Sequence, residues 1–331
     1  MQVIDYNAIK KNAEYFRALI GQSKLCAVLK NNAYGHGLTH VARQLVELVD
    51  CYAVGTVDEA EQIQFLNKDV LVLLPQNLRS AERAIKAGFI LTLDSFDTLK
   101  TIDTACDRVG RTARVHIKID SGMSRLGFNN AQLDELIEKL ENSKFSVEGI
   151  FSHLYGESFP ECDRQLDYFN LCSEALQRGL NKPFVRHIAN TGATLLSKKY
   201  HLDMVRVGLG LYGYGCENLL PAKKVCADVI SVRDVPAGSV AGYGAIYKCD
   251  KDSKIAVINL GYANGLVRIL RGSRIAINGQ KCKVVAICMA MSLVDVTGLD
   301  VKVGDTAVLL ADGINISNDE VIIYELLCNL Q

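Results

Sequence analysis

The sequence predicts an α/β protein, with a (β/α)8 TIM barrel followed by a smaller, mostly β C-terminal domain. Three observations support this class. Over the first two thirds of the 331 residues, short apolar runs alternate with amphipathic helical patterns. Polar residues follow several of these apolar runs. From about Pro221 onward the runs are short and β-branched, with Gly, Asp and Asn between them and no long helical period until the last residues.

Eight apolar runs are the candidate barrel strands. They are almost continuously apolar, which is typical of parallel strands covered on both faces. In chain order the runs are 25–30, 51–56, 70–75, 90–94, 114–120, 147–153, 185–190 and 204–211. Helical patterns lie between them at 39–49, 57–66, 79–87, 96–109, 131–141, 162–178 and, as a short stretch, 193–197.

This alternation fits a closed barrel, and an open doubly wound sheet is the alternative. The polar residues favour the barrel. They lie at or near the carboxyl ends of the first, fifth, sixth, seventh and eighth runs. A closed barrel brings all these ends to one mouth, whereas an open sheet would leave some of them at opposite edges.

The second domain is predicted to be mostly β. Its strand candidates are 225–232, 254–260, 274–277, 282–289 and 306–310. We therefore divide the chain into a barrel domain, residues 1–222, and a C-terminal β domain, residues 223–331.

Charge and composition exclude several classes of protein. Lys plus Arg and Asp plus Glu both number 37, so no basic field favours nucleic acid. The apolar runs are too short to cross a bilayer, and the N-terminus has no apolar signal core. Six scattered histidines show no metal-ligand spacing, and eleven cysteines form no CxxC pair. We expect a cytoplasmic protein with reduced thiols, no metal, no membrane segment and no nucleic-acid partner.

The segment Gly208–Gly213 (GLGLYG) matches the GxGxxG pattern of dinucleotide-binding folds. That interpretation requires a helix to begin there, and the following residues 214–221 have no helical pattern. We instead expect these glycines to let backbone N–H groups approach a phosphate at the end of the eighth strand.

Residues Lys30–Gly37 (KNNAYGHG) follow the apolar run 25–29 and place an amine at the end of the first strand. This segment resembles the pyridoxal-phosphate attachment site of the alanine racemase family. Further segments match that family in order along nearly the whole chain. They are Val115–Gly127 (VHIKIDSGMSRLG), Phe151–His153 (FSH), His187–Thr191 (HIANT), Met204–Gly213 (MVRVGLGLYG), Ala241–Tyr247 (AGYGAIY), Gly261–Gly265 (GYANG) and Cys288–Met289.

The resemblance implies a role for each matched residue. The two catalytic bases are Lys30 and Tyr243, one for each face of the substrate. The residues implied to hold the cofactor, pyridoxal 5'-phosphate, are Lys30, Tyr34, His153, Asn190, Thr191, Arg206, Gly208, Leu209 and Tyr212. The residues implied to contact the substrate are Arg125, Met289 and Tyr262. Lys118 matches a lysine that can be carbamylated in the family and then holds the neighbouring arginine.

The implied function is an isomerase that interconverts L- and D-alanine by a two-base mechanism and supplies D-alanine for peptidoglycan. The family also implies a homodimer with shared active sites. Two alternatives stay open: a serine or serine/alanine racemase of the glycopeptide-resistance type, and a non-catalytic protein that binds pyridoxal phosphate.

Three departures from the family pattern bear on this choice. Asn264 stands where the family usually has aspartate in GYADG, and Ala290-Met291 stand where it usually has Asp-Gln. The family also continues beyond the position of Gln331, so the resemblance implies a C-terminal domain that is truncated at its end. Because two carboxylates are replaced near the substrate, we expect altered activity or specificity.

Overall fold

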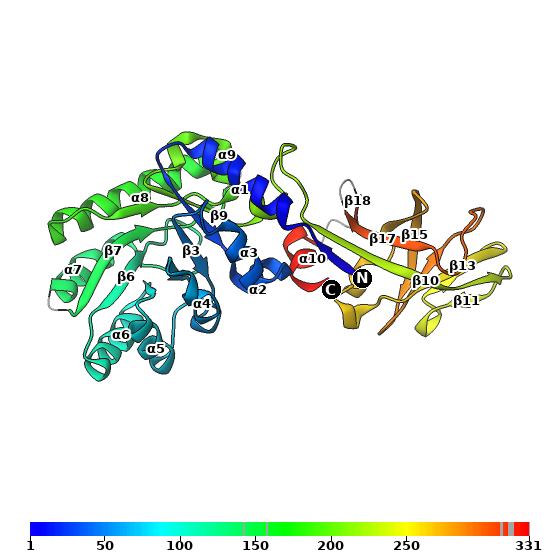
Figure 1. The fold of residues 1–331 in the computed structure, drawn as a ribbon, viewed down its shortest axis with the longest axis horizontal. Helices are drawn as coiled ribbons and strands as arrows, with labels where there is room; N and C mark the ends of the chain where they lie inside the picture. Colours follow the sequence, from blue (N-terminus) through cyan, green and yellow to red (C-terminus); the bar gives the residue numbers. More distant parts are fainter. Residues whose placement is uncertain (142, 157, 312–313, 317–320, 331) are drawn as a thin grey trace. The chain divides into compact units, whose positions relative to one another are not determined.

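The computed structural model describes residues 1–331 except 142, 157, 312–313, 317–320 and 331 (Figure 1). Contacts divide the chain into two compact units. The barrel unit comprises Tyr6–Ala33 and Gly37–Leu220, and the C-terminal unit comprises Met1–Asp5, Tyr34–His36 and Pro221–Gln331. The sequence prediction divides the chain once, after residue 222, into two consecutive domains. That boundary stays a prediction.

Eight parallel strands form the barrel, in the spatial order β8-β7-β6-β5-β4-β3-β2-β9. They are β2 (Lys24–Val28), β3 (Cys51–Val54), β4 (Asp69–Val72), β5 (Ile90–Leu93), β6 (Ala113–Lys118), β7 (Phe145–Phe151), β8 (Val185–His187) and β9 (Met204–Val207). Two hydrogen bonds bring the ends of this sheet together: Asp203 N–H donates to the Arg186 carbonyl (3.1 Å) and Arg206 N–H to the Ala189 carbonyl (3.0 Å). The barrel is therefore nearly closed, as predicted, and the open doubly wound alternative is wrong.

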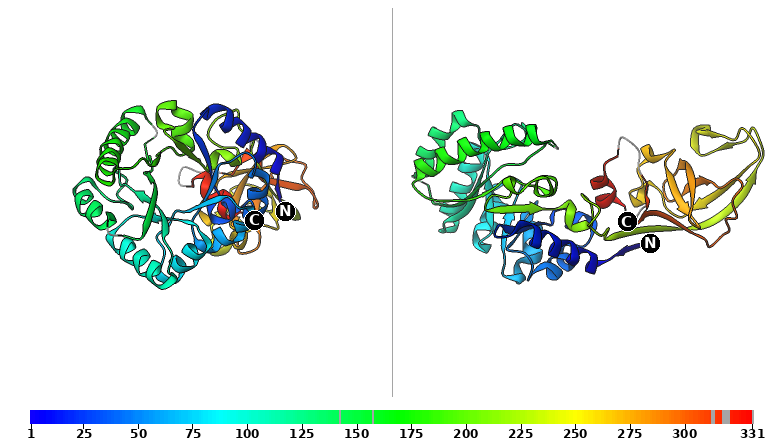
Figure 2. Two further views of the ribbon diagram at one scale, coloured as in Figure 1. Left: turned by 60° about the vertical axis from the view of Figure 1, so that its left-hand side comes forward. Right: turned by 90° about the horizontal axis from the view of Figure 1, so that it is seen from above.

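Helices form an outer ring around these strands (Figure 2, left). They are α1 (Tyr6–Ile20), α3 (Leu38–Leu45), α4 (Val57–Ile63), α5 (Leu78–Ala87), α6 (Phe96–Val109), α7 (Leu133–Glu141), α8 (Phe159–Leu180) and α9 (Thr191–Leu196). Short 3-10 helices are η1 (Gln64–Leu66), η2 (Asn130–Gln132), η3 (Lys198–Tyr200) and η4 (Leu209–Tyr212). No helix within the described residues is long and apolar enough to span a bilayer.

Local chemistry determines where these helices begin and end. Thr56 and Glu59 form a capping box at the start of α4, and Ser95 caps α6 through the N–H of Thr98. Gly110 ends α6 in the left-handed conformation, with φ of 68°. Helix α1 is absent from the sequence predictions, although its apolar residues recur at helical spacing.

The segment after β2 is a left-handed helical turn. Within α2 (Lys30–Gly35), residues Asn31, Asn32, Ala33 and Tyr34 have φ between 52° and 54°, and Gly35 has 74°. Left-handed backbone costs roughly 1–2 kcal/mol for each residue other than glycine. The predicted polar turn after the first strand is thus a strained element that surrounding structure must hold in place.

The C-terminal unit is mostly β, as predicted, and its strands pair antiparallel. Its elements are β1 (Gln2–Ile4), β10 (Lys223–Val235), β11 (Val240–Ala241), η5 (Tyr243–Ala245), β12 (Tyr247–Lys248), β13 (Ser253–Ile258), η6 (Tyr262–Asn264), η7 (Arg268–Leu270), β14 (Arg274–Ile277), β15 (Gln280–Ile287), β16 (Ser292–Asp295), β17 (Thr306–Ala311), β18 (Ile314–Asn315) and α10 (Ile323–Asn329). The long strand β10 pairs with β17 through residues 225–228 and with β13 through residues 229–235. Six strands, β10-β13-β16-β15-β14-β17, therefore close into a second, smaller barrel. The predicted truncation concerns Gln331, which lies outside the described residues.

Candidate active site

The carboxyl ends of the barrel strands carry a buried cluster of cations. Lys118, the last residue of β6, and Arg206 of β9 are only 6% and 4% exposed. Both lie over the ring of Phe151, with the Lys118 Nζ atom 4.7 Å and the Arg206 guanidinium carbon 5.3 Å from its centroid. Neither cation forms an ion pair within the described part of the chain. Unpaired buried cations are costly, so the cluster is suited to an anionic ligand.

Arg206 is held by neighbouring strand ends rather than by a carboxylate. Its Nη1 lies 2.8 Å from Nδ1 of His187 and donates to the His187 carbonyl (3.0 Å), and its Nη2 donates to the carbonyls of Ser152 (2.6 Å) and Ile188 (3.4 Å). These contacts fix the plane of the guanidinium. They leave its Nε–H without an acceptor among the described residues, and that group is available to a ligand.

A buried histidine pair continues this network. The Nε2 atom of His187 lies 2.9 Å from Nδ1 of His116. Because Arg206 has only donors, Nδ1 of His187 is the acceptor, and its Nε2 carries the hydrogen donated to His116. Burial lowers the pKa of both histidines, that of His116 to about 3, so both are neutral. Neither histidine has a role predicted from the sequence, although each is a polar residue in an apolar strand that also carries, or directly precedes, a residue with a predicted role.

Positive charge and burial also shift the neighbouring groups. Burial first, and then Arg206 and Arg125, lower the pKa of Lys118 to about 7. Burial, followed by Arg206, Lys118, Arg125 and Lys30, lowers the pKa of the half-buried His153 to about 3. The charges of Lys30, Lys118, Arg125 and Arg206 therefore act on the same part of the barrel, around His153. Burial also lowers the pKa of Arg206 to about 10, so it still keeps its charge at neutral pH.

Backbone amides after β9 converge on one hydroxyl. Thr191 Oγ1 accepts the N–H of Gly208 (3.3 Å) and of Gly210 (3.1 Å). Asn190 caps α9 by accepting the N–H of Ala193 (3.0 Å), and its Nδ2 donates to the Leu154 carbonyl (2.9 Å). The N–H of Leu209 has no acceptor among the described residues. A hydroxyl, an unused amide and a rigid cap make this edge suitable for a phosphate.

Lys30 begins the left-handed turn and is half-buried. On one side, Glu59 accepts the N–H groups of Gly55 (2.8 Å) and Asn32 (3.2 Å), and so ties the turn to the end of β3. On the other side, the Tyr212 hydroxyl donates to the Val28 carbonyl (3.1 Å) at the end of β2. Tyr212 thus supports the strand that leads to Lys30, and its predicted contact with the cofactor stays a prediction.

Two further predicted residues belong to different units, Tyr34 to the C-terminal unit and Arg125 to the barrel unit. Tyr34 is buried, with its ring centroid 5.7 Å from that of Tyr324, and its role with phosphate stays a prediction. Arg125 is exposed and follows a loop in which Asp120 Oδ1 accepts the N–H groups of Gly122 and Ser124, each at 3.0 Å.

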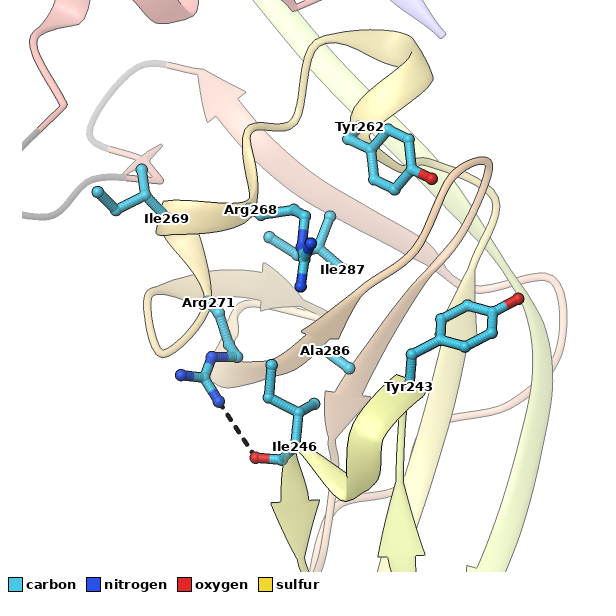
Figure 3. Close-up of a pocket in the computed structure, with 8 residues that line it drawn as sticks. All are labelled: Tyr243, Ile246, Tyr262, Arg268, Ile269, Arg271, Ala286 and Ile287. Atoms are coloured by element: carbon cyan, nitrogen blue, oxygen red, sulfur yellow. Dashed lines mark hydrogen bonds between the residues drawn. The ribbon is translucent and has the colours of Figure 1, made fainter.

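The C-terminal unit presents Tyr243 on an exposed turn. Tyr243 is 84% exposed, and its neighbours Gly242, Gly244 and Ala245 have φ of 80°, 67° and 51°. A side chain at position 242 would clash, because its Cβ would lie 2.7 Å from that of Ala286. Figure 3 shows Tyr243 and Tyr262 on one side of a hollow, with their hydroxyl groups directed the same way.

Backbone contacts join Tyr262 to the predicted substrate-binding residue Met289. Tyr262 N–H donates to the Cys288 carbonyl (3.0 Å), and Ala263 N–H to the Met289 carbonyl (2.9 Å). Met289 is 61% exposed, and its N–H has no acceptor within the described residues. Asn264 accepts the Gly261 N–H (3.2 Å). An aspartate at position 264 would offer the same acceptor oxygen, so the departure removes a charge while this turn contact persists.

Two family models together match nearly the whole chain. Residues 4–215 match the family model described as alanine racemase, N-terminal domain, and residues 222–331 match the one described as alanine racemase, C-terminal domain. Alanine racemase 2 of Caldanaerobacter subterraneus is 32% identical, covering 96% of this chain and 87% of the relative. The alanine racemase of Methanococcus maripaludis is 33% identical, covering 98% of this chain and 94% of the relative.

Solved structures are similar over the whole chain. The alanine racemase of Streptomyces coelicolor has a TM-score of 0.92 at 27% identity and covers 100% of this chain and 95% of its own. The Bartonella henselae alanine racemase, solved with covalently bound pyridoxal phosphate, has a TM-score of 0.91 at 29% identity and covers 100% and 96%.

Proposed function

Because the chain belongs to the alanine racemase family, we propose that Lys30 and Tyr243 are the two proton-transfer groups of a racemase that uses pyridoxal phosphate. The protein is an isomerase that interconverts L- and D-alanine. We propose that it works in the cytoplasm and supplies D-alanine for peptidoglycan.

The barrel residues fit the cofactor. The Nε–H of Arg206 would meet the pyridine nitrogen, while Thr191 and the Leu209 N–H would hold the phosphate, and His153, Asn190 and Gly208 complete this set. Lys30 would carry the covalent link. The observation that carries the proposal is Arg206, a buried cation held only by neutral acceptors and with one donor left over. When bound, the cofactor supplies an electron acceptor that makes the α-proton of alanine acidic enough to remove.

Inversion requires that a proton leave one face of the α-carbon and return to the opposite face. We assign removal on one face to the amine of Lys30 and transfer on the other to the phenol of Tyr243. Arg125 and the Met289 N–H orient the substrate carboxylate, with Tyr262 beside it. Lys118, with a pKa of about 7, has a substantial neutral amine fraction, which is the form that reacts with carbon dioxide to give a carbamate.

We further propose a homodimer in which Tyr243 and Met289 of one protomer complete the barrel site of the other. Their exposure, 84% and 61%, supports this, because groups that carry out proton transfer and carboxylate binding need shielding from water.

Mixed variants test this arrangement. Lys30→Ala and Tyr243→Phe are each purified, mixed and allowed to exchange subunits. If two protomers share sites, half of the dimers are mixed and each has one intact site, so alanine racemisation recovers to about a quarter of wild type. If each chain completes its own site, the mixture stays inactive.

A parallel measurement separates the alternatives. Deuterium exchange at the α-carbon, followed by NMR, compares L-alanine with L-serine. We expect faster exchange with L-alanine. Faster exchange with L-serine would favour the serine racemase alternative, and no exchange despite bound cofactor would favour the non-catalytic one.

A further inference from the structure

Three sulfur-bearing side chains meet toward the amino ends of adjacent strands in the barrel unit. Cys26 of β2 pairs in register with Cys51 of β3, and β9 borders β2 on its other side. The Sγ atom of Cys51 lies 3.5 Å from the Sδ atom of Met204, the first residue of β9. The side chains of Cys51 and Cys26 are hydrogen-bonded to each other. These three residues, which we call the sulfur cluster, bring three soft donor atoms together.

The sulfur cluster is buried and can be reached from one side. Cys26 is fully buried and Met204 is 3% exposed, whereas Cys51, the first residue of β3, is half-buried. A buried set of donors with an entry path is what a metal site requires. An ion would enter past the Cys51 thiol and be shielded from water once bound.

The donor set favours a soft metal ion. Thiolate and thioether sulfur favour copper(I), whereas zinc sites in proteins are built from cysteine, histidine and carboxylate ligands. Within the described residues, no group of three or more histidine, cysteine, aspartate or glutamate side chains could hold a metal ion. Because the third donor here is the thioether of Met204, the sulfur cluster is suited to copper(I) rather than to zinc.

The spacing of the sulfur atoms is close to what such an ion needs. Metal–sulfur bonds of about 2.3 Å place three sulfur atoms in a trigonal site roughly 4 Å apart. The separation of 3.5 Å between the sulfur atoms of Cys51 and Met204 therefore has to widen only slightly. Side-chain rotation can supply this, so the barrel strands need not move.

The charge inside the barrel also suits this ion. Copper(I) replaces the two thiol protons, which leave to solvent, so the loaded sulfur cluster carries one net negative charge. Arg206, the register partner of Cys26 on β9, is a buried cation that forms no ion pair among the described residues. A negative centre on the neighbouring strand lowers the cost of burying this guanidinium.

We propose that Cys26, Cys51 and Met204 form a three-sulfur site that binds one copper(I) ion. This inference replaces the expectation that the chain binds no metal. That expectation considered residues close together in the sequence, whereas these three meet only because the barrel closes. The ion keeps its oxidation state on binding, so no oxidant or reductant is needed. The inference does not depend on the proposed function, since none of the three residues has a role there.

Competition with bicinchoninate, a coloured chelator of copper(I), tests the site on the reduced holoprotein without oxygen. We expect the wild type to take copper(I) from the chelator. Cys51→Ser should bind the ion at least about 100-fold more weakly and Met204→Leu about tenfold more weakly, because each loses one sulfur donor. Cys216→Ser, which removes a half-buried thiol elsewhere in the barrel unit, should keep the wild-type affinity.

X-ray absorption at the copper edge of the loaded wild type is a second measurement that needs no variant. Three sulfur neighbours at about 2.3 Å would support the site, and nitrogen or oxygen neighbours would overturn it. Failure of the wild type to take copper(I) from the chelator, or equal affinity in the wild type and Cys51→Ser, would overturn it as well. Unchanged affinity in Met204→Leu would exclude the thioether and with it the three-sulfur site.

Discussion

The two groups of site residues, one in each unit, are built in opposite ways. In the barrel unit, Arg206 and Lys118 are buried, and hydrogen bonds to residues at the ends of two strands, β7 and β8, hold Arg206. In the C-terminal unit, Tyr243 stands on a glycine-rich turn and is 84% exposed. The barrel group holds fixed charge and has little freedom to move, whereas the C-terminal group places a proton donor at a surface.

This difference indicates that the two groups of residues have different roles. Fixed charge in a dry environment is effective because no reorganisation is needed when the ligand binds. An exposed phenol acquires a comparable environment only when another surface covers it. The barrel group is therefore expected to govern cofactor binding and stability, and the C-terminal group to govern catalysis with little effect on stability.

The largest expected effect comes from Lys30→Ala. It removes both the covalent link and one of the two bases, so alanine racemisation should fall by about 10⁴-fold or more. Racemisation rate and absorbance of covalently bound cofactor are the measurements. Lys24→Ala, which removes an exposed lysine at the start of β2, is the matched control. Substantial racemase activity in Lys30→Ala would show that Lys30 is neither a catalytic base nor the residue that links the cofactor.

Next comes Tyr243→Phe, which should slow racemisation by about 10²–10⁴-fold, unequally in the two directions. Because the side chain is exposed, the free energy of unfolding should change by less than about 0.5 kcal/mol. Chiral assay in both directions and urea denaturation measure the two quantities, with Tyr247→Phe as control. Wild-type rates in both directions would contradict the two-base assignment.

As the pH is lowered, the barrel unit should begin to lose stability at a higher pH than it would if only carboxylates were titrating. The pKa of His116 and of His153 is about 3 in the folded state, whereas an unfolded histidine titrates near 6.5. Between these values the unfolded chain binds more protons, so stability is complete above about pH 6.5 and declines as the pH falls toward 3. Urea midpoints between pH 4.5 and 7.5 measure the slope, which should be shallower in His116→Asn. An unchanged slope in that variant would mean that His116 is not buried in its neutral form.

The smallest effect is expected from Asn190→Ala, which removes the cap of α9 and should cost about 1 kcal/mol of stability. Asn77→Ala removes the same kind of cap from α5, where Asn77 accepts the Ser80 N–H at 3.0 Å. Similar loss of stability is expected in both variants, with weaker cofactor binding only in Asn190→Ala. Equal cofactor affinity in Asn190→Ala and Asn77→Ala would mean that Asn190 caps α9 without contributing to phosphate binding.

Much of the barrel follows from local pattern. All eight predicted strands form, and the predicted helix at 96–109 coincides with α6. These elements can be predicted from apolar runs that have helix-capping or helix-breaking residues at their ends. Helix α1 was missed because its apolar face is interrupted by Asn12, a buried residue that bonds the main chain of Leu220, and local pattern does not reveal such a partner.

The site was predictable only where the family resemblance supplied it. The His116–His187–Arg206 network depends on the lateral order of β6, β7, β8 and β9, since residues far apart in sequence meet only when the sheet closes. The left-handed turn was likewise hidden, because asparagine, alanine and tyrosine adopt that backbone only when tertiary contacts impose it.

That turn has a consequence for how the protein matures. Four consecutive residues after Lys30 wind against the natural handedness of the chain, at a combined cost of several kcal/mol, so a nascent chain gains nothing by forming them early. We expect this segment to be among the last to order, once β2, β3 and Glu59 are assembled. In incompletely folded chains the Lys30 amine would then not be held in its final position. The aldehyde of the cofactor would react with Lys30 only in fully folded molecules.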